Sequence, residues 1–417
     1  MRIAGYDINA ASKKLVHLKN LSSVKRNHWR ITKKWQIALF HFKNNSIYKR
    51  KVGNHFPDSW NDLPVMHKYD YQNKIERLLS NGFNKKNIYL ANTSGSSGHP
   101  FHFAKDKKTH ALTWAFIVSR YKDLGIDHND LEARFYGIPL EPKAYYLEKL
   151  KDTFLKRKRF SVFDLSPQRF IKFIKEFNNN NYKYIYGYTN AIVLFARYII
   201  ETDLKFKQIC NSLKLIILTS EVCTQEDRAI LKNAFGVPVI SEYGASEFGY
   251  IGFEKAPGKW EVVNDLVYLE NDIEGNILIT DLHNKAFPFI KYKIGDVGDV
   301  YTDSEGTQHI ENLKGRTSDN IILPSGKISP GLTFYYISRS ILEKTNFLQE
   351  FIIKQIELDY FIFDIVSKRA IDDDISLEIK DKMDKYLEPG LRFDLNRVNF
   401  IKRPNSGKIK HFYSMLN

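Results

Sequence analysis

Short apolar runs alternate with helical segments through the middle of the chain, and this alternation constrains the fold more than any other feature. The run Leu213–Leu218 (LKLIIL) is typical of a buried strand. A helix is expected next at Gln225–Phe235, and a second strand at Val237–Ser241. Strands that alternate with helices indicate an α/β layer fold whose sheets are largely parallel or mixed.

Periodic patterns elsewhere extend the α/β prediction toward the N-terminus. Apolar residues at helical spacing predict helices at 24–43, 74–80, 108–122, 167–178 and 189–202, and a strand is expected at 87–92.

The C-terminal part of the chain has a different texture. Between Lys259 and Val300, short alternating runs such as 276–280 and 290–292 predict a β-rich subdomain. Beyond Gly315, strands at 351–366 and 393–401 and a helix at 374–387 predict a small α+β unit. A chain of 417 residues is long enough for two or three domains. We therefore predict a large domain over 1–315 and a small, mobile domain over 316–417.

Positive charge is concentrated in the first sixty residues. Residues 1–60 contain 13 Lys and Arg but only two acidic residues, Asp7 and Asp58, within a chain of net charge +15. One interpretation is a solvated basic helix that packs on the body of the protein. The alternative is attraction to an anionic membrane surface, a lipid-linked glycan or another polyanion. Nucleic acid is not an expected partner, because no recognition motif accompanies the charge.

Cysteine content and hydropathy narrow the class of protein. Two cysteines, Cys210 and Cys223, are too few for a disulfide framework or a cysteine-rich zinc site. No apolar run approaches the roughly 18 residues that span a bilayer. The first ten residues lack the layout of a signal peptide. We expect a cytoplasmic protein whose basic N-terminal region could bind peripherally to the inner face of the membrane.

Two polar segments follow predicted strands and could bind phosphate. The loop Thr93-Ser94-Gly95-Ser96-Ser97-Gly98 offers backbone N–H groups and hydroxyls that can surround phosphate oxygens, although its spacing differs from a Walker loop. The segment Thr219-Ser220-Glu221 comes directly after the strand at 213–218, at the edge of a parallel sheet where ligands bind. Each segment alone fits an ordinary turn or helix cap equally well.

Three further segments carry groups that a nucleotide could use. The first, Glu242–Gly249 (EYGASEFG), has an aromatic ring for a purine, a hydroxyl for a phosphate and a carboxylate for Mg²⁺. The second, Asp281–Gly298, contains an Asp in a Gly-flanked turn that could accept ribose hydroxyls. The third is a pair of segments: Gly315–Asp319 precedes the C-terminal tail, and Pro404–Lys408 lies within it. A mobile C-terminal domain could therefore carry a lysine to the reacting centre.

Taken together and in this order, the five segments resemble those of the adenylate-forming superfamily of acyl–coenzyme A synthetases, adenylation domains and luciferases. The runs TSEVCTQEDR, SEYGASEFG and NKAFPFIKYKIGDVGD are most similar to the phenylacetate–coenzyme A ligase branch, and within it to the relatives of capsular polysaccharide biosynthesis. The resemblance covers roughly Trp35 to Phe412.

The resemblance implies a role for each matched residue. The loop Thr93–Gly98 would close over the ATP phosphates, and Tyr243, followed by Gly244, would stack on adenine. Ser246 would contact the α-phosphate and Glu247 would hold Mg²⁺. The remaining implied residues are Asp296 and Arg316 on the ribose, Lys408 on the α-phosphate and the attacking carboxylate, and Ser220 and Glu221 on the nucleotide side of a strand end.

The implied activity is an ATP-dependent ligase reaction that forms AMP. A small carboxylic acid would be adenylated with release of pyrophosphate, and its acyl group would pass to coenzyme A. An alternative acceptor is an amine or a hydroxyl, for instance on a sugar of a surface polysaccharide. A second alternative is an inactive nucleotide-binding partner protein. Tyr136, Tyr188 and His283 are candidates for the acyl pocket.

Overall fold

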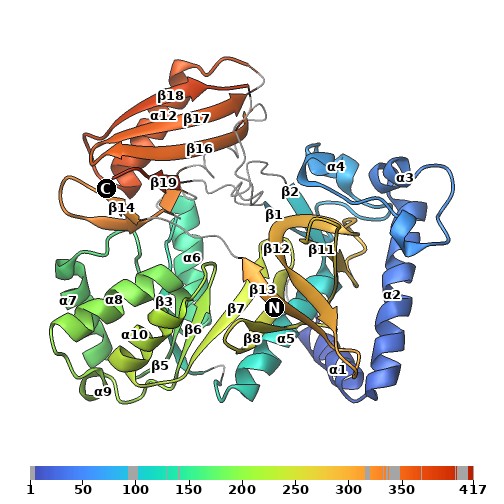
Figure 1. The fold of residues 1–417 in the computed structure, drawn as a ribbon, viewed down its shortest axis with the longest axis horizontal. Coiled ribbons are helices and arrows are strands. Elements are labelled where there is room, and N and C mark those ends of the chain that lie inside the picture. Colours follow the sequence, from blue (N-terminus) through green and yellow to red (C-terminus); the bar gives the residue numbers. More distant parts are fainter. Residues whose placement is uncertain are drawn as a thin grey trace. The chain divides into compact units, whose positions relative to one another are not determined.

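The computed structural model describes residues 5–92, 102–127, 129–139, 141–314, 320–331, 333–334, 337, 348–367, 369–399, 401 and 412–416. These residues form two compact units (Figure 1). Unit 1 comprises the described residues among 1–93, 99–125 and 243–314, and unit 2 comprises those among 126–242 and 315–417. Each unit has its own hydrophobic core.

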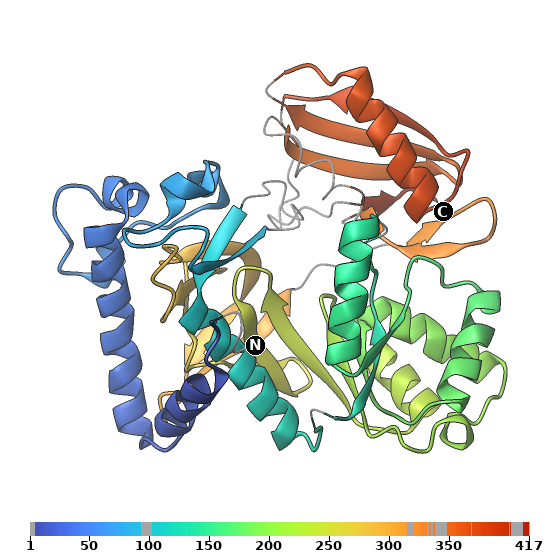
Figure 2. The ribbon, with the colours of Figure 1, turned by 180° about the vertical axis from the view of Figure 1, so that it is seen from behind.

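Helices make up the N-terminal part of unit 1. They are α1 (Ile8–Lys19), α2 (Ser23–Asn44), α3 (Ser46–Val52), α4 (Ile75–Leu78) and α5 (Lys107–Asp123), with short 3₁₀ turns at Trp60–Asp62 and Lys68–Tyr71. The first three helices begin at Asp7, Ser22 and Asn45, whose side chains each accept a backbone N–H of the first turn. Figure 2 shows α1 lying beside α2, and α1 also packs on α5. The predicted helices at 24–43 and 108–122 are therefore confirmed.

The β-rich part of unit 1 is antiparallel. Its strands are β1 (Ile88–Asn92), β2 (His102–Asp106), β8 (Gly249–Ala256), β9 (Lys259–Val262), β10 (Val267–Asn271), β11 (Asn276–Asp281), β12 (Tyr292–Thr302) and β13 (Gln308–Lys314). β1 pairs with β2, and the others follow the order β10-β11-β12-β13-β9-β8. The strand expected at 290–292 begins only at Tyr292, because Lys291 has φ +46° and interrupts the extended backbone, and it then continues to Thr302.

Unit 2 contains the parallel strands that the alternating pattern predicts. Its first part consists of β3 (Leu131–Phe135), α6 (Pro142–Phe154), β4 (Arg157–Phe160), α7 (Pro167–Asn178), β5 (Tyr182–Tyr188), α8 (Thr189–Glu201), α9 (Phe206–Ile209), β6 (Leu215–Thr219), α10 (Gln225–Phe235) and β7 (Val239–Ala245). The strands pair in parallel in the order β7-β6-β5-β3-β4. They continue the strand order given above, so the largest sheet has eleven strands and is mixed, which agrees with the predicted α/β fold of parallel and mixed sheets.

Local sequence explains why α10 forms where it is expected. Thr224 accepts the N–H of Asp227, and the Asp227 carboxylate accepts the N–H of Thr224, which is a complete capping box. Leu231 and Phe235 on its inner face are buried in the core of unit 2. The cap and the buried face together define both ends of this helix.

The C-terminal part of unit 2 is a small α+β layer. Its elements are β14 (Asn320–Ile322), β15 (Ile328–Pro330), β16 (Leu348–Glu357), β17 (Tyr360–Ser367), α12 (Asp373–Tyr386), β18 (Arg392–Arg397) and β19 (Phe412–Ser414). Four strands pair in the order β18-β17-β16-β19. The helix α12 buries Ile375, Ile379 and Met383 in the same apolar cluster as Phe361 and Phe363 of β17. This part confirms the predicted α+β character of the tail.

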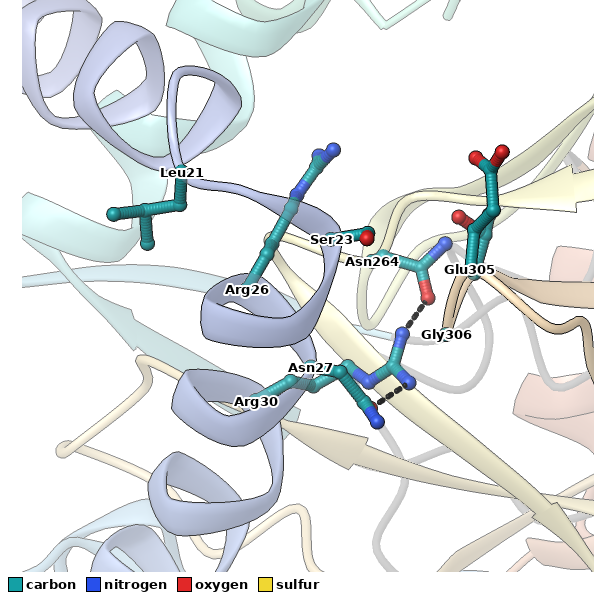
Figure 3. Close-up of a pocket in the computed structure, with 9 residues that line it drawn as sticks. Leu21, Ser23, Arg26, Asn27, Arg30, Asn264, Glu305 and Gly306 are labelled. Atoms are coloured by element: carbon teal, nitrogen blue, oxygen red, sulfur yellow. Dashed lines mark hydrogen bonds between the residues drawn. The ribbon is translucent and has the colours of Figure 1, made fainter.

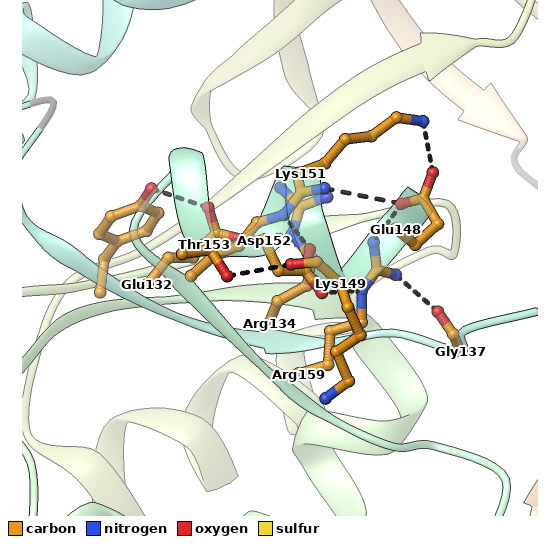
Figure 4. Close-up of polar contacts among 11 residues, drawn as sticks. Glu132, Arg134, Gly137, Glu148, Lys149, Lys151, Asp152, Thr153 and Arg159 are labelled. Atoms are coloured by element: carbon orange, nitrogen blue, oxygen red, sulfur yellow. Dashed lines mark hydrogen bonds and ion pairs between the residues drawn. The ribbon is translucent and has the colours of Figure 1, made fainter. Parts of the chain in front are cut away.

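A buried ionic network joins α6 to the strands β3 and β4 in unit 2 (Figure 4). Asp152, only 5% exposed, accepts hydrogen bonds from both Arg157 and Arg159. Arg159 also donates to Glu148 Oε2 at 2.6 Å and to the carbonyl of Gly137 at 2.6 Å. Each arginine therefore meets a carboxylate, as buried charges require.

None of the helices formed by the described residues has both the length and the apolar character needed to cross a membrane.

Candidate active site

In unit 2, the predicted site residues lie where parallel strands end at their carboxyl edge. Tyr136 follows β3, Tyr188 ends β5, and Glu221 follows β6. The rings of Tyr136 and Tyr188 are in contact, with centroids 4.1 Å apart. Open α/β sheets bind their ligands at this edge. The two tyrosines proposed for the acyl pocket are therefore brought together with the predicted strand-end carboxylate on one edge of the sheet.

Glu221 is held in place by the start of α8. Its Oε2 accepts the backbone N–H of Asn190 at 2.8 Å, and its carbonyl accepts the hydroxyl of Thr189 at 3.1 Å. Its Oε1 is buried and has no hydrogen-bond partner among the described residues. Burial raises the pKa of Glu221 to about 7. The preceding Ser220 is exposed and has φ +72°, a conformation that costs free energy and is frequent at functional sites.

In unit 1, the turn between β7 and β8 carries the second group of predicted residues. A Cβ on Gly244 would lie 2.2 Å from the carbonyl oxygen of Gly249, so the two backbones approach closely only because position 244 is glycine. Gly249 itself has φ +78° and no room for a Cβ beside Thr113. These two glycines shape the turn that presents Ser246, which is exposed, and Glu247, which is buried.

Tyr243 and Asp296 are in direct contact. The phenol of Tyr243, at the end of β7, donates to Asp296 Oδ2 of β12 at 2.8 Å. The residues are 53 positions apart, and both were predicted to contact the nucleoside. The bond fixes the Tyr243 ring relative to the carboxylate, so an adenine and its ribose could be bound by one preformed pair.

Glu247 lies in a buried polar group that includes one residue the sequence did not suggest. The hydroxyl of Tyr292 donates to Glu247 Oε1 at 3.0 Å. Lys105 of β2 is 3% exposed, and a Cβ built on Gly249 would be 3.8 Å from its Nζ. Burial lowers the pKa of Lys105 to about 8, and the carboxylates of Asp281 and Glu247 oppose that shift.

Lys105 was missed because a single lysine in a short strand gives no motif. The only signal in the sequence is its place between the apolar pair Phe103-Ala104 and the helix cap Asp106, where a fully buried cation is unusual. In the structure it is the cation that stands beside Glu247, and it belongs with the candidate site.

His283 does not join this group. Its Nε2–H donates to the carbonyl of Asp265 at 2.7 Å, and its Nδ1 accepts from the ammonium of Lys14 at 3.0 Å. Burial and the neighbouring Lys14 lower the pKa of His283 to about 3, so the ring is neutral. Both ring nitrogens are occupied, which leaves His283 as a structural residue rather than a pocket residue.

Several predicted site residues lie outside the described residues. These are the loop Thr93, Ser94, Gly95, Ser96, Ser97 and Gly98, together with Arg316 and Lys408. Their roles remain predictions from the sequence.

Comparison with known proteins places the fold. No protein-family model matches the chain. Protein CapK of Staphylococcus aureus is 22% identical over 368 residues, which cover 84% of this chain and 78% of CapK. The indoleacetate–lysine synthetase of Pseudomonas savastanoi is 31% identical over 90 residues, only 20% of this chain and 22% of that enzyme.

Solved structures with a similar fold cover most of the chain. A 2-hydroxyisobutyryl-CoA ligase in complex with 2-HIB-AMP and CoA, in the thioesterification state, superposes with a TM-score of 0.57 at 16% identity, covering 94% of this chain and 90% of the ligase. The open conformation of that ligase gives a TM-score of 0.55 at 15% identity, covering 94% and 92%. The predicted likeness to adenylate-forming enzymes is thereby confirmed at the level of architecture, and the chain has the fold of the adenylate-forming CoA ligases.

Proposed function

We propose that the chain activates a carboxylic acid with ATP, forming an acyl-adenylate and pyrophosphate, and then transfers the acyl group to an acceptor. The observation that carries the proposal is the preformed pair Tyr243–Asp296, which shares unit 1 with the buried Glu247. A ring, a ribose-binding carboxylate and a metal-binding carboxylate are the groups that a nucleotide site requires. They occur here in a chain with the fold of adenylate-forming CoA ligases.

The chemistry to be assisted is the union of two anions. The substrate carboxylate attacks the α-phosphorus, a bond forms to that phosphorus, and the bond to pyrophosphate breaks. Negative charge accumulates on the α-phosphoryl oxygens, so the site must direct cations and N–H donors toward them. Lys105 is a candidate for one such cation, because its buried ammonium lies beside the turn that carries Ser246 and Glu247.

Glu247 fits a role in binding Mg²⁺. Oxygen ligands suit this ion, which usually binds one or two protein carboxylates together with substrate phosphates and water. Glu247 offers such a carboxylate, and the bond from Tyr292 to one of its oxygens orients it. No group of three or more His, Cys, Asp or Glu side chains within the described part of the chain could hold a metal ion by itself. When bound, the ion would neutralise phosphate charge.

The remaining roles rest on the sequence. We assign Lys408 to the α-phosphate and the attacking carboxylate, Arg316 to the ribose, and the loop Thr93–Gly98 to the β- and γ-phosphates. The small domain over 316–417 would bring Lys408 to the nucleotide for the first half-reaction. It would also shield the reactive acyl-adenylate from water before the acceptor enters.

Two acceptors are supported by different comparisons. Coenzyme A is favoured by the similarity of the fold to a 2-hydroxyisobutyryl-CoA ligase over 94% of this chain. An amine is favoured by the 90-residue match to an indoleacetate–lysine synthetase. A sugar acceptor rests on the sequence resemblance to the relatives of capsular polysaccharide biosynthesis. We place coenzyme A first because the structural match covers most of the chain.

Pyrophosphate release tests the proposal directly. The full chain is incubated with ATP, Mg²⁺ and a panel of aryl, fatty, hydroxy and amino acids, and any acid that is activated is then offered coenzyme A or amines. Acid-dependent pyrophosphate release supports adenylation, and thioester or amide formation identifies the acceptor. Binding of ATP by calorimetry without release on any acid would instead favour an inactive nucleotide-binding partner.

A further inference from the structure

The three N-terminal helices contain no acidic residue, and two small groups can be distinguished among their basic residues. Helices α1, α2 and α3 together carry twelve Lys and Arg and no Asp or Glu. One group faces the body of unit 1 and anchors the helices there. The other group, together with lysines from two further segments, gathers at one place without carboxylate partners.

Arg26, Arg30 and Lys34 are the anchors. Arg26 makes a two-pronged ion pair with Asp265, at 2.7 and 2.6 Å. Arg30, 3% exposed, donates to Asn264 (Figure 3). Both residues line a cavity of about 140 Å³. The ammonium of Lys34 lies 4.3 Å from the ring centroid of Trp60 and 4.0 Å from that of Tyr268. These three side chains attach α2 to other parts of unit 1.

Four other lysines form what we call the lysine cluster: Lys14 of α1, Lys33 of α2, Lys108 of α5 and Lys285 of the loop after β11. A chain of contacts draws them together. Lys14 Nζ lies 3.0 Å from His283 Nδ1, two residues before Lys285. The backbone N–H of Lys285 donates to Asp106 at 2.8 Å, two residues before Lys108.

Aromatic rings of α2 complete the arrangement. The ring of Trp29, one helical turn before Lys33, lies 5.8 Å from that of His283. The ammonium of Lys285 lies 5.0 Å from the ring centroid of Phe40, two turns after Lys33. Both contacts are on the flank of α2 that Lys33 occupies.

The positive charge of the cluster is only partly balanced by the described residues. None of its four ammonium groups is in an ion pair there. Asp106 is the one carboxylate that raises the pKa of Lys14, and both of its oxygens already accept hydrogen bonds, from Thr109 and from the Lys285 backbone. Burial lowers the pKa of Lys14, and Lys33, Lys108 and Lys285 lower it further.

The position of Lys108 adds to this repulsion. Lys107 and Lys108 occupy the first turn of the seventeen-residue helix α5, where the helix dipole disfavours cations and favours anions. Like charges that are packed together at the positive end of a helix destabilise the folded chain, and a bound anion would remove that cost. Lysine is a common phosphate ligand.

We propose that Lys14, Lys33, Lys108 and Lys285 form a binding site for a multiply charged phosphate group, carried either by a soluble diphosphate or by a lipid headgroup. This site is distinct from the residues assigned to adenylation and does not depend on that assignment. It uses a small part of the basic region, while the anchors only hold the helices in place.

Two probes and two matched variants test the proposal. One variant is Lys14→Gln with Lys33→Gln and Lys285→Gln. The control is Lys25→Gln with Lys43→Gln and Lys86→Gln, three exposed lysines of unit 1 that remove the same charge. Binding of inorganic diphosphate is measured by calorimetry. Co-sedimentation is measured with vesicles of phosphatidic acid, whose phosphomonoester can carry two charges, and phosphatidylcholine in equal parts, and with phosphatidylcholine alone.

We expect the cluster variant to lose about ten-fold or more in affinity, equivalent to about 1.4 kcal/mol or more, and the control to change by less than about three-fold. Loss confined to diphosphate identifies a soluble ligand, and loss confined to the phosphatidic acid vesicles identifies a headgroup. The cluster variant should also melt no lower than wild type, because repulsion is relieved. Equal losses in both variants, or no binding to either probe, would overturn the proposal.

Discussion

Glu221→Gln is the substitution with the most clearly defined energetic consequence. Glu221 has an ordinary pKa of 4.5, and burial raises its pKa to about 7 in the folded chain. An acid with a raised folded pKa ionises first in the unfolded state. Its presence therefore weakens folding as pH rises from 4.5 through 7, whereas glutamine at this position does not titrate.

The size of the effect follows from the two pKa values. Between about pH 5 and about pH 8, the wild-type chain should lose at most about 2.5 kcal/mol of stability relative to Glu221→Gln. The amide nitrogen would replace Oε1, which has no partner, so the variant carries a fixed cost. That cost is the same at both pH values and cancels in the comparison.

The measurement is urea unfolding of both chains at the two pH values, followed by tryptophan fluorescence and circular dichroism. The matched control is Glu201→Gln, which replaces an exposed carboxylate at the end of α8. A difference between wild type and Glu221→Gln that stays flat across this pH range would refute the reasoning, because it would mean that the carboxyl titrates alike in both states.

Four further substitutions probe the site. Lys408→Ala should abolish pyrophosphate release while calorimetry shows ATP binding largely intact; equal loss of both would contradict its proposed role. Glu247→Gln should raise the Mg²⁺ concentration needed for half-maximal turnover, and an unaltered Mg²⁺ titration would count against metal binding. Tyr243→Phe removes the 2.8 Å bond to its carboxylate partner and should weaken ATP binding roughly five-fold, or about 1 kcal/mol, by calorimetry. Gly249→Ala places a Cβ 2.8 Å from Thr113 Cγ2 at φ +78° and should lower stability by about 1–3 kcal/mol in thermal unfolding; combining it with Thr113→Ser should restore part of the loss.

Local sequence patterns predicted those helices and strands whose caps and apolar faces lie within one short segment. The helix at 225–235 has its capping box and its buried face in the same eleven residues, so its bounds agree with the structure. The strand at 213–218 is shifted by one or two residues, since an apolar run marks burial better than it marks ends. The order of the strands in the mixed sheet could not be predicted, because the antiparallel partners of β8 to β13 are set by tertiary pairing.

Site residues that lie in recognisable motifs could be predicted from the sequence. Site residues that are defined by tertiary packing could not. Tyr243, Glu247 and Asp296 stand in recognisable segments, and the contact of Tyr243 with Asp296 was not foreseeable from a separation of 53 residues. Lys105 needed the structure, because only its burial beside Glu247 distinguishes it from the chain's other lysines. His283 was misjudged because its partner Lys14 is 269 residues away.

The arginine pair on β4 also protects an outer strand of the protein. β4 ends the strand order of the largest sheet, and an unprotected edge invites pairing with another chain. Arg157 and Arg159 point to one face and both bind Asp152, while Lys158 between them points to the other. A slip by one residue would bury Lys158 and leave Asp152 without either guanidinium. The strand is thereby locked against sliding, and its charged surface makes it a poor template for aggregation.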